Sequence, residues 1–134
     1  MIPSTSGFLN QDFKIQEQPS KTYCMELEGT SVRGTCDGLE AVTQAVFRIL
    51  NTERYAYVIY SWKYGIETID LYGEPVTWVC PELERRIKEA LLMDTRILSV
   101  TDFVFDTETK GVIHVTFTVN TIYGAISAEK GVQI

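Results

Sequence analysis

The sequence predicts an α+β fold in which two principal helices pack on one face of a mainly antiparallel sheet. Two segments repeat apolar residues at helical spacing, and several others alternate apolar and polar residues as strands do. Along the chain the order is two strands, a helix, an irregular middle, a second helix and three strands. That order places the helices against one face of the sheet.

Length and composition suit one compact domain with a real core. The chain has 134 residues and a hydrophobic fraction of 45%. Its net charge of −6, from 18 acidic and 12 basic residues, argues against nucleic acid and against a membrane surface as partners. No apolar run approaches the roughly 20 residues that span a bilayer. The N-terminus also lacks the basic-then-apolar order of a secretory signal.

Residues 1–20 are expected to form an extended N-terminal arm, and residues 21–134 a single α+β domain. The arm is rich in Pro, Ser, Gln and Asn and shows no periodicity. Its apolar residues pack either on its own domain or on a neighbouring protein, and the sequence favours neither. These residues are Phe8, Leu9, Phe13 and Ile15.

A strand pair and a helix are predicted in the first half of the domain. Alternation over residues 22–29 predicts a strand with Cys24 on its wet side, and a turn leads to a return strand over 31–35. Asp37 is a good N-cap for a helix over 38–51, in which apolar residues recur at helical spacing.

The middle of the chain, residues 53–76, is rich in aromatic residues, and its apolar residues show little helical or strand periodicity. Core packing explains them better than a binding surface does, because aromatics bury so much area. They are Tyr55, Tyr57, Tyr60, Trp62, Tyr64 and Tyr72.

A second helix is predicted over 81–94, with Pro81 in its first turn. An earlier start near Val76 is left open, because Pro81 would kink such a helix.

Three strands are predicted in the C-terminal part. They span residues 97–106, 112–120 and 125–134. In the second of them, four apolar residues face one way, and His114 lies among the polar residues that face the other. The last strand is the weakest and ends the chain, so we expect it to be a sheet edge.

No residue pattern indicates a catalytic, metal or cofactor site, and none is predicted. Motifs for phosphate loops, dinucleotides, metalloproteases and nucleophile elbows are absent from the sequence. The three cysteines form no CxxC pair, which indicates free thiols. They are Cys24, Cys36 and Cys80, and a disulfide between Cys24 and Cys36 is the less favoured alternative. A zinc site would need these cysteines and His114 to converge, and they are scattered in sequence.

An acid and an arginine lie one residue apart where the second helix meets a strand, in Asp94-Thr95-Arg96. As a structural clasp, Asp94 closes the turn by bonding to nearby backbone and Arg96 meets the negative end of the helix dipole. As a contact for a partner, Arg96 directs its five donors toward carbonyls or carboxylates of another chain. On the residues alone the clasp is slightly favoured.

A family resemblance runs from Leu39 to Phe105. It is carried, in order, by AVFRILNTERY, IYSWKYGIETIDLYG and LERRIKEALLMDTRILSVTDFVF. Together these segments resemble the baseplate wedge and sheath-initiator family of contractile injection machines, which includes phage tails, R-type bacteriocins and the TssE subunit of type VI secretion. The resemblance is closest to the XkdS-like branch. Many members carry Glu-Pro-Arg at the corner, whereas Asp94-Thr95-Arg96 keeps the acid and the arginine without the proline.

The resemblance implies a non-enzymatic structural subunit of an inner baseplate, in a phage tail or phage-tail-like particle assembled in the bacterial cytoplasm. It implies that the Asp94-Thr95-Arg96 corner contacts a helical bundle of larger wedge subunits. It also implies a sheet edge on which the first sheath ring begins to assemble by strand addition, with six-fold symmetry. Tube or hub proteins are further candidate partners. The candidate edge residues are Ala125, Ile126, Ser127, Ala128 and Glu129.

Two other functions are weighed against this one. A carboxylate-based, lysozyme-like cell-wall hydrolase associated with the tail needs only two acids, and Glu67, Asp70 and Glu74 lie in the irregular middle. Because 18 acids in 134 residues make such groups common, solvated charges explain them better. A soluble adaptor of the same fold, binding a cellular regulator, is the weaker third option.

Overall fold

The computed structural model describes residues 14, 16, 19–26 and 29–134. In chain order its elements are β1 (Thr22–Met25), β2 (Val32–Cys36), α1 (Gly38–Leu50), the short 3₁₀ helix η1 (Ile69–Leu71), α2 (Val76–Leu92), β3 (Ile97–Asp106), β4 (Val112–Thr121) and β5 (Gly124–Gln133). The predicted α+β class is confirmed. Most of the expected N-terminal arm, with its four apolar residues, lies outside the described residues.

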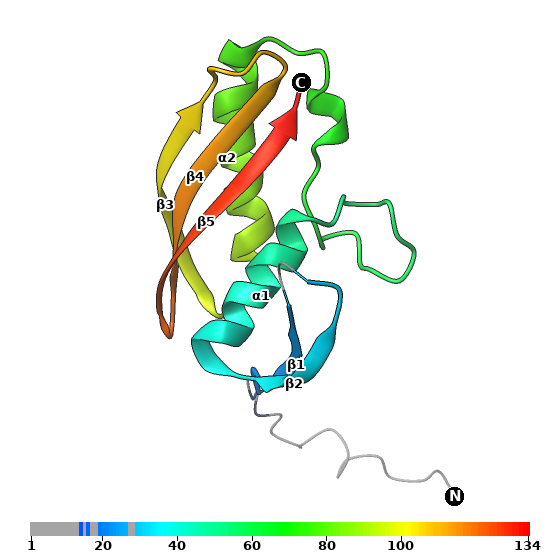
Figure 1. The fold of residues 1–134 in the computed structure, drawn as a ribbon, viewed down its shortest axis with the longest axis vertical. Coiled ribbons are helices and arrows are strands. Elements are labelled where there is room, and N and C mark those ends of the chain that lie inside the picture. The colour runs from blue at the N-terminus through cyan, green and yellow to red at the C-terminus, as the bar shows by residue number, and fades with distance from the viewer. Residues whose placement is uncertain (1–13, 15, 17–18, 27–28) are drawn as a thin grey trace, which may run out of the picture.

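The strands form two antiparallel sheets (Figure 1). One has the order β3-β4-β5, and the other is a separate ribbon of β1 and β2. Helix α1 contacts both β1 and β5, and α2 lies along β3 behind the larger sheet. The ribbon therefore packs on α1 and does not extend the three-stranded sheet.

Helix α1 begins at a capping residue, and helix α2 begins directly after a proline. The Asp37 carboxylate accepts a hydrogen bond from Gly38 N at 2.7 Å, as the predicted N-cap of α1. Helix α2 begins at Val76 after Pro75 and includes Pro81, so the earlier of the two starts is the observed one. No helix in the described part of the chain is long and apolar enough to cross a membrane.

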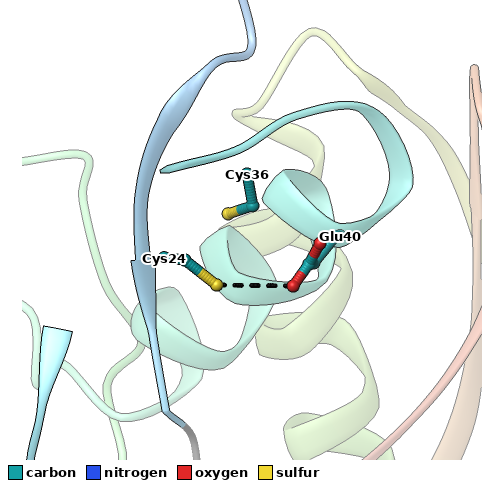
Figure 2. A group of neighbouring side chains, drawn as sticks. All are labelled: Cys24, Cys36 and Glu40. Carbon is teal, nitrogen blue, oxygen red and sulfur yellow. Dashed lines mark hydrogen bonds between the residues drawn. The ribbon is translucent and has the colours of Figure 1, made fainter. Parts of the chain in front are cut away.

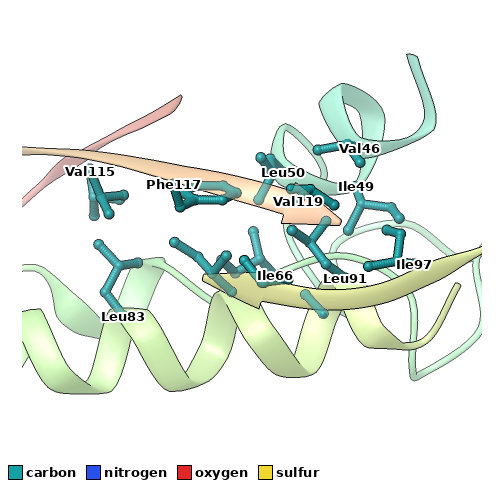
Figure 3. Close-up of a cluster of buried hydrophobic side chains, with 14 of the residues drawn as sticks. Val46, Ile49, Leu50, Ile66, Leu83, Leu91, Ile97, Val115, Phe117 and Val119 are labelled. Atoms are coloured by element: carbon teal, nitrogen blue, oxygen red, sulfur yellow. The ribbon is translucent and has the colours of Figure 1, made fainter. Parts of the chain in front are cut away.

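The core lies between α2 and the inner face of the three-stranded sheet, and α1 closes one end (Figure 3). The apolar side chains of β4 and α2 that were predicted to face inward are each at most 2% exposed, while His114 is exposed. They are Ile113, Val115, Phe117 and Val119 in β4 and Leu83, Ile87, Ala90 and Leu91 in α2.

Truncation of Phe117 is expected to be strongly destabilising. Phe117 is 1% exposed and stacks on Phe103 with ring centroids 5.3 Å apart. Phe117→Ala should lower the free energy of unfolding by about 3–5 kcal/mol, because it removes buried area and leaves a cavity. Denaturant unfolding measures the loss. The control Thr116→Ala, at an exposed position of the same strand, should stay within about 0.5 kcal/mol.

The prediction of a wet face on the Cys24 side of β1 is wrong. Tyr23 is 74% exposed, whereas the Cys24 thiol points to α1 and donates to Glu40 at 3.4 Å. Gln44 of α1 fixes this orientation by accepting from Met25 N at 2.9 Å and donating to the Tyr23 carbonyl at 2.8 Å. In so short a strand, these polar contacts decide the inward face and apolar alternation does not.

Two adjacent charged residues organise the segment between the helices. The Glu53 carboxylate accepts from Thr68 N at 2.7 Å and from Thr68 Oγ1 at 2.6 Å. Arg54, with a side chain 10% exposed, donates to the Gly65 carbonyl and to Glu89 of α2. Gly65 has φ of +92°, and a side chain there would meet a backbone carbonyl oxygen at 2.5 Å, so the turn requires glycine.

The interpretation of the aromatic residues as core is wrong for most of them. Aliphatic Ile66 and Leu71 enter the core from this segment. The residues 55–62, which we call the apolar loop, instead present large side chains to solvent. The exposed members are Tyr55, Tyr57, Val58, Ile59 and Trp62, at 56% to 103% exposure.

Candidate functional site

The Asp94-Thr95-Arg96 corner joins α2 to β3 and forms a closed clasp. Asp94 Oδ1 accepts from Arg96 N and Nε, both at 3.0 Å, and Asp94 Oδ2 accepts from Arg96 Nη2 at 2.7 Å. The two side chains are 15% and 20% exposed. Ile122 N also donates to the Arg96 carbonyl at 3.0 Å, which ties the corner to the β4–β5 turn. Asp94 therefore closes the turn as the clasp interpretation predicts, and the Arg96 guanidinium pairs with the Asp94 carboxylate.

We expect the Asp94 carboxyl to titrate below its ordinary range. Burial on its own raises the pKa of Asp94, but hydrogen bonds from the Arg96 side chain and backbone outweigh it, and the net shift is downward. A lowered pKa stabilises the fold above the unfolded value, and this stabilisation is lost as pH falls through the folded value. Below about pH 4, stability should fall less steeply in Asp94→Asn than in the wild type. Equal slopes in acid unfolding would contradict the assignment.

The same corner borders a hollow of about 570 Å³ between α1 and the residues that precede β1. Lys21, Arg48 and Arg96 line it, and none of the described lining residues is acidic. The described lining of the hollow is thus cationic, in a chain of net charge −6. Guanidinium and ammonium groups suit a carboxylate or carbonyl oxygen of another chain. The hollow is thus compatible with the partner-contact interpretation of Arg96.

β5 is an edge of the three-stranded sheet, because among the described residues it pairs with β4 alone. Its pairing is regular from Thr121↔Gly124 to Val112↔Gln133, with no register shift. β3, at the opposite edge, is interrupted by two register shifts, and Asp102 there adopts φ of +59°. Bulges discourage strand pairing at an edge, so β5 is the better template for an added strand.

The register shows which main-chain groups of β5 point away from β4. Thr121 and Gly124 are opposite each other across a two-residue turn and exchange hydrogen bonds, and hydrogen-bonded pairs alternate from there along an antiparallel ladder. The N–H and C=O groups of Ala125, Ser127 and Glu129 therefore point outward. Of the five residues 125–129 predicted for the edge, these three carry the outward main-chain groups, and Ile126 and Ala128 bond to β4.

A groove of about 370 Å³ follows this edge between β5 and α1. Phe47 and Leu50 line it from α1, and Ser127 and Glu129 line it from β5. Phe47 remains 38% exposed in it. The groove places an accessible apolar surface beside outward-pointing backbone groups, which is the combination that strand addition uses.

The three carboxylates weighed for hydrolysis form no acid–base pair. Asp70 is paired with Arg86, whose Nη2 lies 2.9 Å from Asp70 Oδ2, and these hydrogen bonds lower the pKa of Asp70. A general acid needs the opposite shift. Glu67 lies 3.7 Å from Arg54, and Glu74 is exposed. The geometry gives the hydrolase alternative no support.

Sequence reasoning missed two surfaces, the cationic hollow and the apolar loop. Lys21 and Arg48 are far from Arg96 in sequence, and no local pattern indicates that the fold brings them together. For the loop, a signal was available: Val58 and Ile59 interrupt the aromatics without forming either a helical or a strand period.

Comparison with known proteins places these surfaces in context. A family model for the contractile injection system sheath initiator matches residues 11–124. The chain is 38% identical over 127 residues to the phage-like element PBSX protein XkdS of Bacillus subtilis strain 168, covering 90% of this chain and 89% of that protein. A crystal structure described as a proposed tail lysozyme from Geobacter sulfurreducens matches with a TM-score of 0.59 and 17% identity, over 71% of this chain and 89% of that one. At that identity the structural match supports the fold alone.

Proposed function

The chain belongs to the contractile injection system sheath-initiator family, and from that premise we propose how this structural protein of a contractile-tail baseplate works. It links wedge proteins of the inner baseplate to the first ring of sheath subunits. It initiates the sheath by accepting a strand on β5. The observation that carries the proposal is the regular, shift-free edge of β5 beside an apolar groove.

Strand addition suits this edge for a physical reason. An added strand lies about 4.8 Å from its neighbour and bonds to the outward N–H and C=O groups. Ala125, Ser127 and Glu129 supply such groups in succession. Glu129 and Lys130 place charge on the edge, which discourages pairing with unrelated strands.

The wedge contact is assigned to the corner and its cationic hollow. The Asp94 clasp holds the Arg96 guanidinium in a fixed orientation, so little side-chain entropy is lost when a partner docks. Carbonyl or carboxylate groups of a wedge helical bundle fit the basic lining of Lys21, Arg48 and Arg96. Six copies in a ring, assembled in the bacterial cytoplasm before sheath growth, complete the proposal.

The apolar loop is a further contact surface in this scheme, for baseplate, tube or hub proteins. Val58 is 103% exposed and Trp62 is 83% exposed. Large aromatic and aliphatic side chains at a protruding position are typical of protein–protein contacts. Arg54, directly before the loop, donates to the carbonyl of Lys63, directly after it, and to Glu89 of α2, so the apolar residues are presented on a fixed base.

Deleting the gene that encodes this chain from the producing bacterium tests the function directly. Particles made without it should contain tail tubes that lack sheath, because no edge is available to start the first sheath ring. Electron microscopy of purified particles provides the measurement, and complementation with the wild-type chain should restore sheathed tails. Normally sheathed tails in the deletion strain would refute the proposed role.

A further inference from the structure

Three metal-ligating side chains meet where the β1–β2 ribbon packs on α1 (Figure 2). The thiols of Cys24 and Cys36 come from the two strands of the ribbon, and the Glu40 carboxylate comes from the first turn of α1. Their donor atoms lie within 4.8 Å of one another, and Cys24 Sγ is 3.4 Å from Glu40 Oε1. From this convergence we propose that Cys24, Cys36 and Glu40 bind one divalent metal ion of the zinc class.

The donors have the chemistry and the spacing of a tetrahedral site. With metal–sulfur distances of about 2.3 Å and metal–oxygen distances of about 2.1 Å, neighbouring donors in a tetrahedron lie roughly 3.6–3.8 Å apart. The observed separation of Cys24 Sγ and Glu40 Oε1 is already close to that value. Two sulfurs and a carboxylate oxygen are ligands that zinc accepts. Cys24 is half-buried and Glu40 is exposed, so solvent reaches the cluster and can supply the fourth ligand.

The surroundings hold the ligands in place. Cys36 is 5% exposed, and its thiol donates to Gln44 Oε1 at 3.6 Å. That same oxygen accepts from Met25 N, so Gln44 joins both strands of the ribbon to α1. Gln44 also donates to the Tyr23 carbonyl, so the backbone on either side of Cys24 is held against α1. The Cys36 thiol gives up its proton when it binds a metal, so its hydrogen bond to Gln44 Oε1 belongs to the metal-free state. Glu40 is exposed and has the freedom to adjust to an ion.

The ribbon register favours a bridging ion over a disulfide. Cys36 is opposite Thr22, so Cys24 and Cys36 are diagonal neighbours, and Gly34 at φ +64° adds a bulge between them. Diagonal residues in an antiparallel pair lie about 7–8 Å apart. A disulfide rarely spans more than about 6.8 Å between Cα atoms. A metal ion bound to both sulfurs can join two cysteines whose Cα atoms lie this far apart.

Electrostatics also favours a cation at this point. Two thiolates and a carboxylate with donor atoms within 4.8 Å of one another repel each other when all three are anionic. A dication replaces the thiol protons on binding and removes that repulsion between the ligands. Binding should therefore release protons and strengthen as pH rises.

Binding at this position would couple two parts of the chain. The metal would join β1 and β2 to α1, and β1 is the element through which residues 1–20 connect to the domain. It would therefore fix the base of the N-terminal segment. The site is independent of the proposed sheath contact, so either proposal stands if the other fails.

The test uses the untagged full-length chain, kept reduced with a phosphine and stripped of metal. Co²⁺ serves as the spectroscopic probe and Zn²⁺ as the competitor. We expect one Co²⁺ per chain, with a thiolate-to-cobalt charge-transfer band and visible bands of tetrahedral coordination, and displacement of Co²⁺ by Zn²⁺. Calorimetry in two buffers of different ionisation enthalpy should show proton release on Zn²⁺ binding.

Variants separate this site from adventitious binding. Cys24→Ser and Glu40→Gln should each weaken binding more than tenfold, since loss of an outer hydrogen-bonding partner alone costs roughly 10–100-fold. Cys80→Ser is the matched control, because Cys80 lies in α2 outside the cluster, and it should bind as the wild type does. Glu40 is exposed, so Glu40→Gln tests the site even if loss of a cysteine impairs folding. Absence of the charge-transfer band, or full affinity in Cys24→Ser and Glu40→Gln, would overturn the proposal.

Discussion

Ser127→Pro is expected to give a folded chain on which no sheath assembles. The Ser127 N–H points away from β4, so proline removes a group that the fold itself does not use. The chain should still fold, because proline is tolerated in an edge strand where the N–H faces away from the sheet. An incoming strand, however, would lose a main-chain bond and meet the proline ring at the edge. Particles carrying this variant should contain tubes without sheath, as seen by electron microscopy.

Two controls separate loss of the edge from loss of the fold. Ser127→Ala removes the hydroxyl but keeps the N–H, so it should support normal sheath. Ala128→Pro removes an N–H that pairs with Phe117 of β4, so it should destabilise the sheet itself. Sheathed particles with Ser127→Pro would show that the first sheath subunit uses another surface.

The strands after the second helix were predictable from the sequence because each has one solvent-exposed face. In β4 the apolar side chains face α2 and the polar ones face solvent, so apolar alternation matches burial along its length. The edge position of β5 agrees with the prediction, because among the described residues the three strands follow one another in order and β5 pairs with β4 alone. The predicted helix stripes also agree with the structure, except for Leu39 at the start of α1, which is 41% exposed. Tertiary packing of an apolar face decides where such helices lie.

The middle segment and the first strand were not predictable in the same way. Polar contacts set their conformation: Arg54 to Glu89, Glu53 to Thr68, and Gln44 to the β1 backbone. Such contacts join residues that are distant in sequence, and apolar periodicity carries no information about them. The result is that tyrosines expected in the core are exposed, and Cys24, expected on the wet side, faces α1.

The functional corner was predicted as a motif, but its surroundings were not. The Asp94-Thr95-Arg96 sequence indicated both a clasp and a partner contact, and the clasp is formed. Lys21 and Arg48 join it only through the packing of α1 and the residues before β1. Likewise, Cys24, Cys36 and Glu40 converge because the ribbon folds onto α1, and their sequence spacing matches no common metal motif.

Arg96→Ala is expected to lower stability and to abolish docking on the wedge. Removing the guanidinium leaves the Asp94 carboxylate, 15% exposed, without its two side-chain donors. Hydrogen bonds to charged groups contribute about 1.5–3 kcal/mol, so the free energy of unfolding should fall by roughly that amount. The same change removes one cation from the hollow. Chemical denaturation measures the first effect, and co-purification with wedge subunits measures the second.

Comparison with Asp94→Asn distinguishes a structural role of Arg96 from a contact role. Asp94→Asn weakens the clasp but leaves the Arg96 guanidinium beside Lys21 and Arg48. If Arg96 binds the wedge, Asp94→Asn should lose similar stability yet retain most wedge binding, while Arg96→Ala loses both. Arg96→Lys should fall between them, because lysine keeps the charge without the planar fork that a carboxylate accepts. Equal wedge binding by Arg96→Ala and Asp94→Asn would mean that the corner serves the fold and that the wedge is held elsewhere.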